Sequence, residues 1–518
     1  MEIKMNKFLK KAEGFFASRG FSAGVVTALV IALVVVANVI IYTLTALFGF
    51  YIYSPTARDY GISGVTDAVL AEAEEAGEPV TLTFCMAESD LEVHSTGRFV
   101  LETARAYAER YSFVRLKFIN LLTKMDENGT IVKNLDRYKT DMRGKNTPLS
   151  TTSVIFSSGE GKNENYRVLT DVQTTAGFSD FYTLDSNGNP YAYSGEEVIG
   201  SMISWVLTKE HKVAYFTENH GETVDMTLGH LLACAGYYIE TINLRTTGAV
   251  PDDAAFLAIS NPISDFERAD DGAEVDTELE RIDRYLASGG KMYVAIDPYS
   301  KELKNLEALL RREYGITLSG KDGKYGYSRE LVLDPSAAFP TDSMSFVASF
   351  GDSAMASRIT DNIADSANKR VLLSQVSKLE LDPTLGAEAL LISSPSSRVL
   401  WEGETVSEKG GYAVAAYSTR DEGEGVSSAV VVIPTVLMTG ADVLVSNGYS
   451  NRDFVYSILS EVFGAPTVIY GARSVIYNSG VVENLTQSSA VAFTVLLMII
   501  PVALAVLGAV VVIRRKRR

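Results

Sequence analysis

Two long stretches without a charged residue constrain this chain more than any other feature. They cover residues 21–50 and 490–513. About 20 consecutive apolar residues suffice to cross a bilayer as a helix, and neither stretch has the polar face of an amphipathic core helix. The sequence therefore predicts one transmembrane helix near each end of the chain, with a large folded region between them.

The flanking residues set the expected orientation. Five basic residues precede residue 20, and the chain ends in a basic run at 514–518, so both tails are expected to stay in the cytoplasm. The protein is then a two-pass cell-membrane protein whose large middle region is extracytoplasmic. A cleaved signal peptide is the alternative, but its apolar part is about 7–15 residues long and precedes a small-residue cleavage site. Residues 21–50 meet neither condition, which favours an uncleaved anchor.

The charge of the middle region narrows the function classes. Residues 20–513 hold 62 acidic and 37 basic residues. Such an acidic exterior repels nucleic acid and anionic lipid surfaces, and it favours solubility or a cationic partner. We therefore expect no nucleic-acid partner.

The two cysteines, Cys85 and Cys234, allow at most one disulfide. Both lie in apolar runs typical of small buried side chains, so no bridge is predicted, and whether the two thiols pair stays open. Because the sequence has no CxxC or Cys/His ligand spacing, no metal site is predicted.

The first extracytoplasmic domain is placed at residues 79–208, after a stem at 51–78. A buried strand at 80–86, a helical pattern at 99–111 and a second strand at 113–121 predict a strand-helix-strand unit.

Two Asn-Gly segments of this domain look superficially like calcium loops. Residues 126–129 and 185–188 lack the full twelve-residue ligand spacing, and Asn-Gly is itself a turn signal. Turns are predicted at both places, and a helix at 196–208 leads into the next domain.

The second domain, residues 209–466, alternates strands with helices, which indicates a parallel sheet. Ligands of such sheets bind beyond the carboxyl ends of the strands. The predicted strands are at 212–217, 238–244, 254–260 and 292–296.

Polar residues follow three of these strands. They are Asn219, His220 and Glu222 in the first loop, Asn261 in the second and Asp297 in the third. Because the carboxyl ends of parallel strands share one edge, these residues are predicted to converge on a ligand- or partner-binding site.

The region from about 325 to 480 has weaker patterns. Strands at 429–433 and 442–446 are expected to complete the second sheet, with a helix at 452–463. Residues 467–489 form a membrane-proximal segment.

Several of these segments resemble one known family. Residues 213–222 are similar to the strand and following Gly-His-Gly-Glu motif of the auxiliary component of gliding-motility-type ABC transport systems, the GldG-like family. Ser-Gly-Gly-Lys at 288–291, before a strand that ends in Asp-Pro, and Asn-Gly-Tyr-Ser-Asn-Arg-Asp-Phe at 447–454 resemble it as well. Asn219 departs from the pattern, because the family has Gly there. A side chain at this position puts in doubt a close approach of another group to the backbone of residue 219.

The resemblance implies a fold and a role. The fold is an α/β extracytoplasmic region, with a thioredoxin-like α/β unit and a class I glutamine-amidotransferase-like parallel-sheet domain, flanked by the two transmembrane helices. The role is a non-catalytic auxiliary subunit that needs no cofactor and works with a separate ABC permease and a separate ABC ATPase. This chain is not the ATPase, because none of its Gly-Lys pairs is followed by Ser or Thr.

Two other function classes remain open. A membrane-tethered hydrolase or amidotransferase-like enzyme would use His220 and Glu222 as an acid-base pair, or bind a metal with His230. It would need a nucleophile on a sharp turn, whereas Cys234 falls within a predicted helix and no G-x-S-x-G occurs. A structural role, with Glu222 near a helix start, is favoured. A surface sensing or adhesion module is the third class.

The first predicted span carries a possible partner surface. Gly24, Ala28 and Ala32 recur every four residues and permit close helix packing, and Asn38 offers an intramembrane hydrogen bond. These four residues suit a permease contact, although an Ala-rich span shows such spacing by chance about as readily.

Overall fold

The computed structural model describes residues 62–133, 135–170, 178–185, 188–222, 226–268, 276–335, 344–363, 369–446, 448–466, 468–472 and 474–476. Both predicted spans, both tails and the four candidate residues of the first span lie outside these ranges. Within them, no helix combines the length and apolar character needed to cross a membrane. All described residues belong to one compact unit.

The amino-terminal sheet has the strand order β3-β2-β1-β4-β5. Strands β1 and β2 pair in parallel with α4 and α5 between them in the chain, which confirms the predicted strand-helix-strand unit. Strands β4 and β5 add antiparallel pairs on the other side of β1. The elements are β1 (Val80–Phe84), α4 (Glu88–Val93), α5 (Gly97–Arg110), β2 (Val114–Asn120), β3 (Met125–Asp126), β4 (Val154–Ser158) and β5 (Asn165–Leu169).

The segment predicted as a stem contains a helix, α3 (Gly64–Ala76), which packs against α6 (Gly195–Leu207). The hydroxyl of Thr66 donates to Glu196 Oε1 over 2.6 Å, and Leu70 is buried. This part of the stem is therefore joined to the folded region by packing and by hydrogen bonds.

The second sheet is larger and mixed. Its main path is β17-β16-β19-β22-β23-β11-β10-β8-β9. The strands from β9 to β23 are parallel, as predicted, and those from β23 to β17 are antiparallel. The strands are β8 (Val213–Thr217), β9 (Tyr238–Ile242), β10 (Ala254–Ser260), β11 (Lys291–Ala295), β16 (Ser345–Phe350), β17 (Val371–Ser374), β19 (Ala387–Ile392), β22 (Ala413–Gly423) and β23 (Val426–Ile433).

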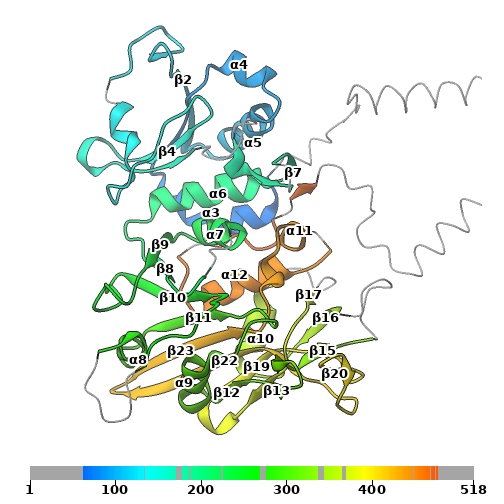
Figure 1. The fold of residues 1–518 in the computed structure, drawn as a ribbon. Helices are drawn as coiled ribbons and strands as arrows, with labels where there is room; N and C mark the ends of the chain where they lie inside the picture. Colours follow the sequence, from blue (N-terminus) through cyan, green and yellow to red (C-terminus); the bar gives the residue numbers. More distant parts are fainter. Residues whose placement is uncertain are drawn as a thin grey trace, which may run out of the picture. The chain divides into compact units, whose positions relative to one another are not determined.

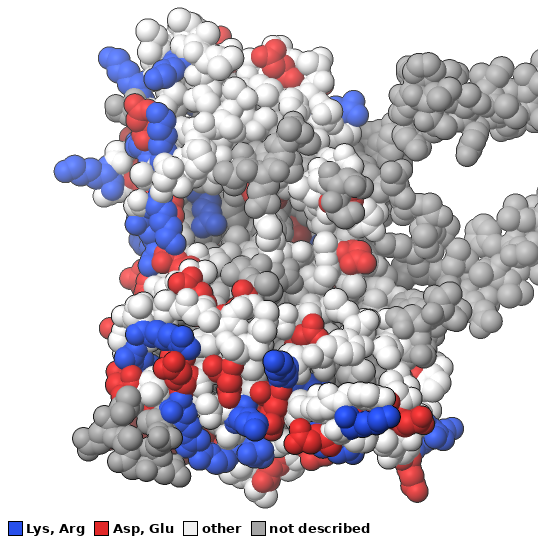
Figure 2. Space-filling model, viewed as in Figure 1, with Lys and Arg blue, Asp and Glu red and all other residues white. Residues whose placement is uncertain are grey.

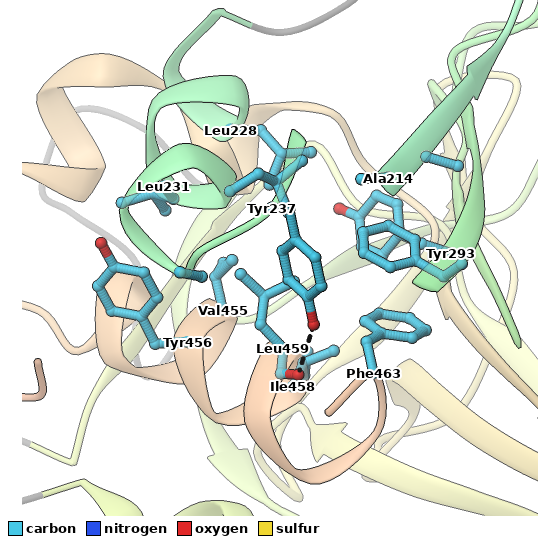
Figure 3. Packing of buried hydrophobic residues seen from close by; sticks show 14 of the residues in the cluster. Ala214, Leu228, Leu231, Tyr237, Tyr293, Val455, Tyr456, Ile458, Leu459 and Phe463 are labelled. Carbon is cyan, nitrogen blue, oxygen red and sulfur yellow. Dashed lines mark hydrogen bonds between the residues drawn. The ribbon is translucent and has the colours of Figure 1, made fainter. Parts of the chain in front are cut away.

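Helices cover both faces of the parallel strands. Figure 1 shows α7 (Met226–Cys234) and α12 (Asn451–Glu461) on one side, with α8 (Glu278–Ala287) and α9 (Lys304–Tyr314) on the other. Apolar side chains from α7 and α12 meet above the sheet, where the Tyr237 hydroxyl donates to the Leu459 carbonyl over 3.4 Å (Figure 3). Burial of these side chains supplies most of the favourable free energy of such a layer.

The predictions for the late region have mixed outcomes. The strand at 429–433 is confirmed as part of β23, and the helix at 452–463 is confirmed as α12. The strand predicted at 442–446 is wrong, because residues Ala441–Leu444 form the short helix α11. The amides of Val443 and Leu444 donate to the Gly440 carbonyl, and such helical bonds exclude a strand ladder.

Several smaller predictions are also resolved. The turn at 126–129 is confirmed, since Asp126 Oδ1 accepts hydrogen bonds from the amides of Asn128 and Thr130. Cys85 and Cys234 are both free and buried. In the segment that follows α12, β24 (Val475–Ile476) pairs with β7 (Pro190–Tyr193). One buried apolar cluster contains residues from both sheets, and a domain boundary at 208/209 stays a prediction.

Candidate functional site at the carboxyl edge of the parallel sheet

The parallel strands run in the order β9-β8-β10-β11-β23, so the chain order reverses between β8 and β10. In sheets of this kind, ligands bind in the crevice at such a reversal, beyond the carboxyl ends of the strands. The loops after β8 and β10 therefore occupy the position where a site is expected, and they contain four of the five predicted residues.

The loop after β8 turns sharply at two residues with positive φ. Asn219 has φ +84° and Gly221 has φ +83°. Glycine favours this left-handed region, and asparagine tolerates it better than most residues because its short polar side chain bonds locally. Asparagine in place of the Gly of the GldG-like pattern is therefore compatible with this backbone.

His220 lies between two carboxylates. Its Nδ1 is 2.9 Å from Glu222 Oε1, and its Nε2 is 3.0 Å from Glu278 Oε2. The backbone amide of His220 also donates to Glu222 Oε2 over 2.7 Å. The side chains of His220, Glu222 and Glu278 are only 1%, 3% and 1% exposed, so water has little access to this cluster.

The electrostatics of this cluster favour an imidazolium. Burial by itself would lower the pKa of His220, but its hydrogen bonds to the carboxylates of Glu222 and Glu278 outweigh burial and raise it. Burial would likewise raise the pKa of Glu222, and its hydrogen bonds to His220 overcome that effect and lower it. The Phe266 ring stacks on the imidazole with centroids 3.9 Å apart, and Arg245 Nε lies 3.2 Å from Glu278 Oε1.

The cluster also joins the two loops of the crevice. The carbonyl of His220 accepts hydrogen bonds from the amides of Ile263 (2.7 Å) and Ser264 (2.9 Å), which follow β10. Glu278 lies in the first turn of α8, where a carboxylate is favoured by the helix dipole. Both ring nitrogens of His220 are engaged by carboxylates, so the imidazole joins the loop after β8 to the first turn of α8.

Asn261 lines a cavity on the α7 side of the same edge. It has φ +54°, and its amide donates to the Ala295 carbonyl over 2.8 Å. Backbone held in this region by surrounding contacts is common at ligand sites. The cavity has a volume of about 240 Å³ and an uncharged lining of Leu228, Ser260, Asn261, Tyr293, Ala295, Val436 and Thr439.

Asp297 builds the turn after β11. Its Oδ1 accepts a hydrogen bond from the amide of Tyr299 over 2.8 Å, and its carbonyl accepts one from the amide of Ser300 over 2.9 Å. Of the five predicted residues, His220 and Glu222 contact each other, as the sequence suggested, through His220 Nδ1 and Glu222 Oε1. Among the described residues, no hydrogen bond or ion pair links Asn261 or Asp297 to His220.

The two other groups considered for chemistry lie elsewhere. Cys234 lies in a helix, as predicted, as the last residue of α7, and burial raises its pKa above the ordinary range. His230 Nε2 lies 3.8 Å from Cys234 Sγ, and burial lowers the pKa of His230. A reactive cysteine needs an accessible thiolate, and these surroundings disfavour one.

Sequence reasoning missed the partners that complete the His220 cluster. Glu278 is 58 positions from His220 in the chain, and Arg245 and Phe266 come from two further segments. The available signal was the placement of Glu278 directly after Thr277 at a helix start, which reads equally well as ordinary capping.

In the segment at 447–454, which resembles the GldG-like family, Asn451 and Arg452 make contacts that stabilise the fold. Asn451 Oδ1 accepts a hydrogen bond from the Leu372 amide over 2.8 Å, and its Nδ2 donates to the carbonyls of Leu372 (2.8 Å) and Met438 (3.2 Å). Next to it, Arg452 forms a buried ion pair with Glu197 of α6 over 3.3 Å. These contacts hold α12 against β17 and α6.

No protein-family model matches the sequence, and no curated protein matches it. Among solved structures, an mmIFT52 N-terminal domain is similar to 48% of this chain over 97% of its own length, at 16% identity and a TM-score of 0.35. The cytoplasmic protein STM3548 from Salmonella typhimurium covers 48% of this chain over 98% of its own length, at 12% identity and a TM-score of 0.29. PurLQS from Thermotoga maritima covers 49% of this chain over 100% of its own length, at 10% identity and a TM-score of 0.26.

Proposed function

We propose that this protein is a non-catalytic, extracytoplasmic auxiliary subunit of an ABC-type transport complex. It is anchored in the cell membrane by helices at residues 21–50 and 490–513, and it acts with a separate permease and a separate ATPase. The GldG-like segments and the charge-free stretches support this role.

The observation that carries the non-catalytic part is the enclosure of His220 by Glu222 and Glu278. A hydrolytic site needs a base within hydrogen-bond reach of a substrate or nucleophile. Here both nitrogens of the only histidine in the strand-end loops face carboxylates, and its side chain is 1% exposed. Such a cluster fixes loop geometry, which is what a docking or handling subunit requires.

The topology supports the finer fold assignment. In the amino-terminal sheet, one parallel pair is extended by two antiparallel strands, in the order β2-β1-β4-β5, which suits a thioredoxin-like unit. The parallel order β9-β8-β10-β11-β23, with helices on both faces, is that of a doubly wound sheet and suits an amidotransferase-like domain.

Handling of substrate at the carboxyl edge is part of the proposal, and Asn261 is its focus. The cavity of about 240 Å³ beside Asn261 has an uncharged lining with hydroxyl and amide groups, which suits a small neutral polar group.

The charges on the visible face do not form one acidic surface, because Lys and Arg lie among Asp and Glu there (Figure 2).

The membrane part of the proposal is tested through Ala28. Gly24, Ala28 and Ala32 fall on one face of a helix, whereas Val30 falls on another. Ala28→Leu adds bulk where close packing is expected, so it should reduce co-purification of the permease with the full-length chain. Val30→Leu is the matched control and should leave co-purification unchanged. Equal recovery with both variants would remove this face from the proposal.

The hydrolase alternative has its own test. The full-length chain should hydrolyse none of the compounds in a screen of ester and amide substrates, and a double variant, His220→Ala with Glu222→Ala, should differ from it only in lower stability. Loss of a measurable hydrolytic activity in a variant that still folds would favour the enzyme. A chain that purifies alone and binds a surface ligand would favour the sensing or adhesion module.

A further inference from the structure

A second cleft lies at the opposite edge of the parallel sheet, where β8, β10 and β11 begin. We call it the amino-edge cleft. It has a volume of about 520 Å³, within the range of small-molecule sites. Four basic residues line it in a chain whose formal net charge is −17: Lys212, Arg281, Arg284 and Lys291. None of these residues belongs to the site at the carboxyl edge.

The two arginines of the amino-edge cleft are already paired. Arg281 Nε lies 3.0 Å from Asp276 Oδ2, and Arg284 Nη2 lies 2.6 Å from Asp276 Oδ1. Arg281 also donates to the carbonyl of Leu244. These contacts hold the arginines in place, and because one carboxylate serves both guanidinium groups, it neutralises only one of their two charges.

The two lysines differ from the arginines in this respect. Among the described residues, no carboxylate lies within ion-pair distance of the ammonium group of Lys212 or Lys291. Asp252 is the one acidic residue of the described lining, and it makes no such pair with either lysine. Lys291 is half-buried, and burial together with the nearby charge of Lys212 lowers its pKa.

The sheet brings the two lysines to the same edge. Lys212 directly precedes β8 and Lys291 begins β11, with β10 between them. Neighbouring strands are about 4.8 Å apart, so the two backbones are about 10 Å apart. Lysine is a point charge on a long flexible stem, and two such stems can converge on one oxyanion over that span.

The rest of the lining suggests what carries the oxyanion. Val250, Pro251 and Phe463 add apolar surface to the cleft. Phe463 is held by stacking on Phe256, with ring centroids 4.2 Å apart. A ligand that fills the cleft therefore meets an apolar wall as well as two ammonium groups.

We propose that the amino-edge cleft binds a small organic oxyanion, a phosphate or carboxylate group on an apolar body, through Lys212 and Lys291. Binding relieves the repulsion between the two ammonium groups and pairs each with an acceptor. The inference goes beyond the transport role, because it requires neither a permease nor the carboxyl-edge site.

The test is isothermal titration calorimetry of the full-length chain in detergent. The probes are inorganic phosphate, phenyl phosphate and benzoate at constant ionic strength. Phenyl phosphate should bind more tightly than inorganic phosphate because its ring meets the apolar wall. Comparison of phenyl phosphate with benzoate identifies which oxyanion the lysines prefer.

Two variants and a control complete the experiment. Lys212→Gln, at an exposed position, should weaken phenyl phosphate binding about tenfold, as expected for a lost charge-assisted hydrogen bond. Lys291→Gln should weaken it at least as much, whereas Lys291→Arg should retain binding. Lys209→Gln removes the same charge three positions from Lys212 and outside the cleft lining, so it should have no effect.

The proposal is overturned if none of the three probes binds saturably. It is equally overturned if Lys209→Gln weakens binding as much as Lys212→Gln does, since that result means a general charge effect. Because the readout is ligand affinity alone, failure here leaves the proposed transport role untouched.

Discussion

His220 Nε2 lies 3.0 Å from Glu278 Oε2, and this contact joins the loop after β8 to the first turn of α8. Both side chains are 1% exposed, so neither charge has water to replace a lost partner. A buried ion pair of this kind is costly to break from one side, because the remaining charge stays buried.

Glu278→Gln should therefore lower the free energy of unfolding by about 2 kcal/mol, the usual range for a buried hydrogen bond to a charged group. The measurement is chemical denaturation of the purified chain, followed by the fluorescence of the buried Trp205. Glu218→Gln is the control, because Glu218 is exposed and two residues from His220. Equal effects of the two substitutions would contradict the role of Glu278.

The pH dependence of stability follows from the raised pKa of His220. Its pKa lies above the ordinary 6.5, so its contribution is full below about pH 6.5 and is lost as the pH rises through the folded-state pKa. The pKa of Glu222 lies below the ordinary 4.5, so its contribution is present above pH 4.5 and is lost as the pH falls through its folded-state pKa. The cluster thus contributes most between pH 4.5 and 6.5.

The check is the difference in unfolding free energy between the natural chain and His220→Gln, measured across this range and up to about pH 9. The difference should be greatest between pH 4.5 and 6.5 and should shrink in alkaline solution. A difference that stays constant would mean that His220 is not charged in the folded protein.

The backbone at Asn219 gives a third prediction. Its φ of +84° suits glycine, so Asn219→Gly should leave stability unchanged or raise it slightly. Asn219→Ala should cost about 1 kcal/mol, because a Cβ without a local polar partner is disfavoured there. Thermal unfolding of the two variants side by side measures this. Equal stability of the Gly and Ala variants would show that the loop does not enforce the turn.

A fourth prediction concerns Asn451, whose side chain joins α12 to β17. In the natural protein, Asn451 Nδ2 donates to the carbonyls of Leu372 and Met438. Asn451→Asp keeps the shape of the side chain but replaces this donor with a carboxylate oxygen, which cannot donate to either carbonyl. The loss should be about 3 kcal/mol, since two buried acceptors lose their donor. Asn128→Asp, in an exposed turn, is the matched control and should change stability by less than about 0.5 kcal/mol. Similar losses in both would contradict the bridging role.

The sequence predicted the buried parallel strands correctly but not the segment at 442–446. The strands that became β1, β8, β10 and β11 were predicted because buried parallel strands appear as short apolar runs between turn signals. The segment at 442–446 was also predicted as a strand, but residues Ala441–Leu444 are helical, because local bonds to the Gly440 carbonyl outweighed the strand propensity of its apolar residues.

The candidate site was predictable only in its local part. His220 and Glu222 are two positions apart, so the sequence alone suggested their pairing. Glu278 joins them through the packing of α8, which no local pattern encodes. The amino-edge cleft was missed for the same reason, because Lys212 and Lys291 are brought together only by strand order.

The central claim, a non-catalytic subunit of an ABC transport complex, is tested most directly by pull-down of the tagged full-length chain in mild detergent, with mass spectrometry of the proteins that co-purify. The account predicts a multi-span permease and an ABC ATPase in a fixed ratio to the bait, retained in several detergents. A chain that purifies alone in every detergent would contradict the claim.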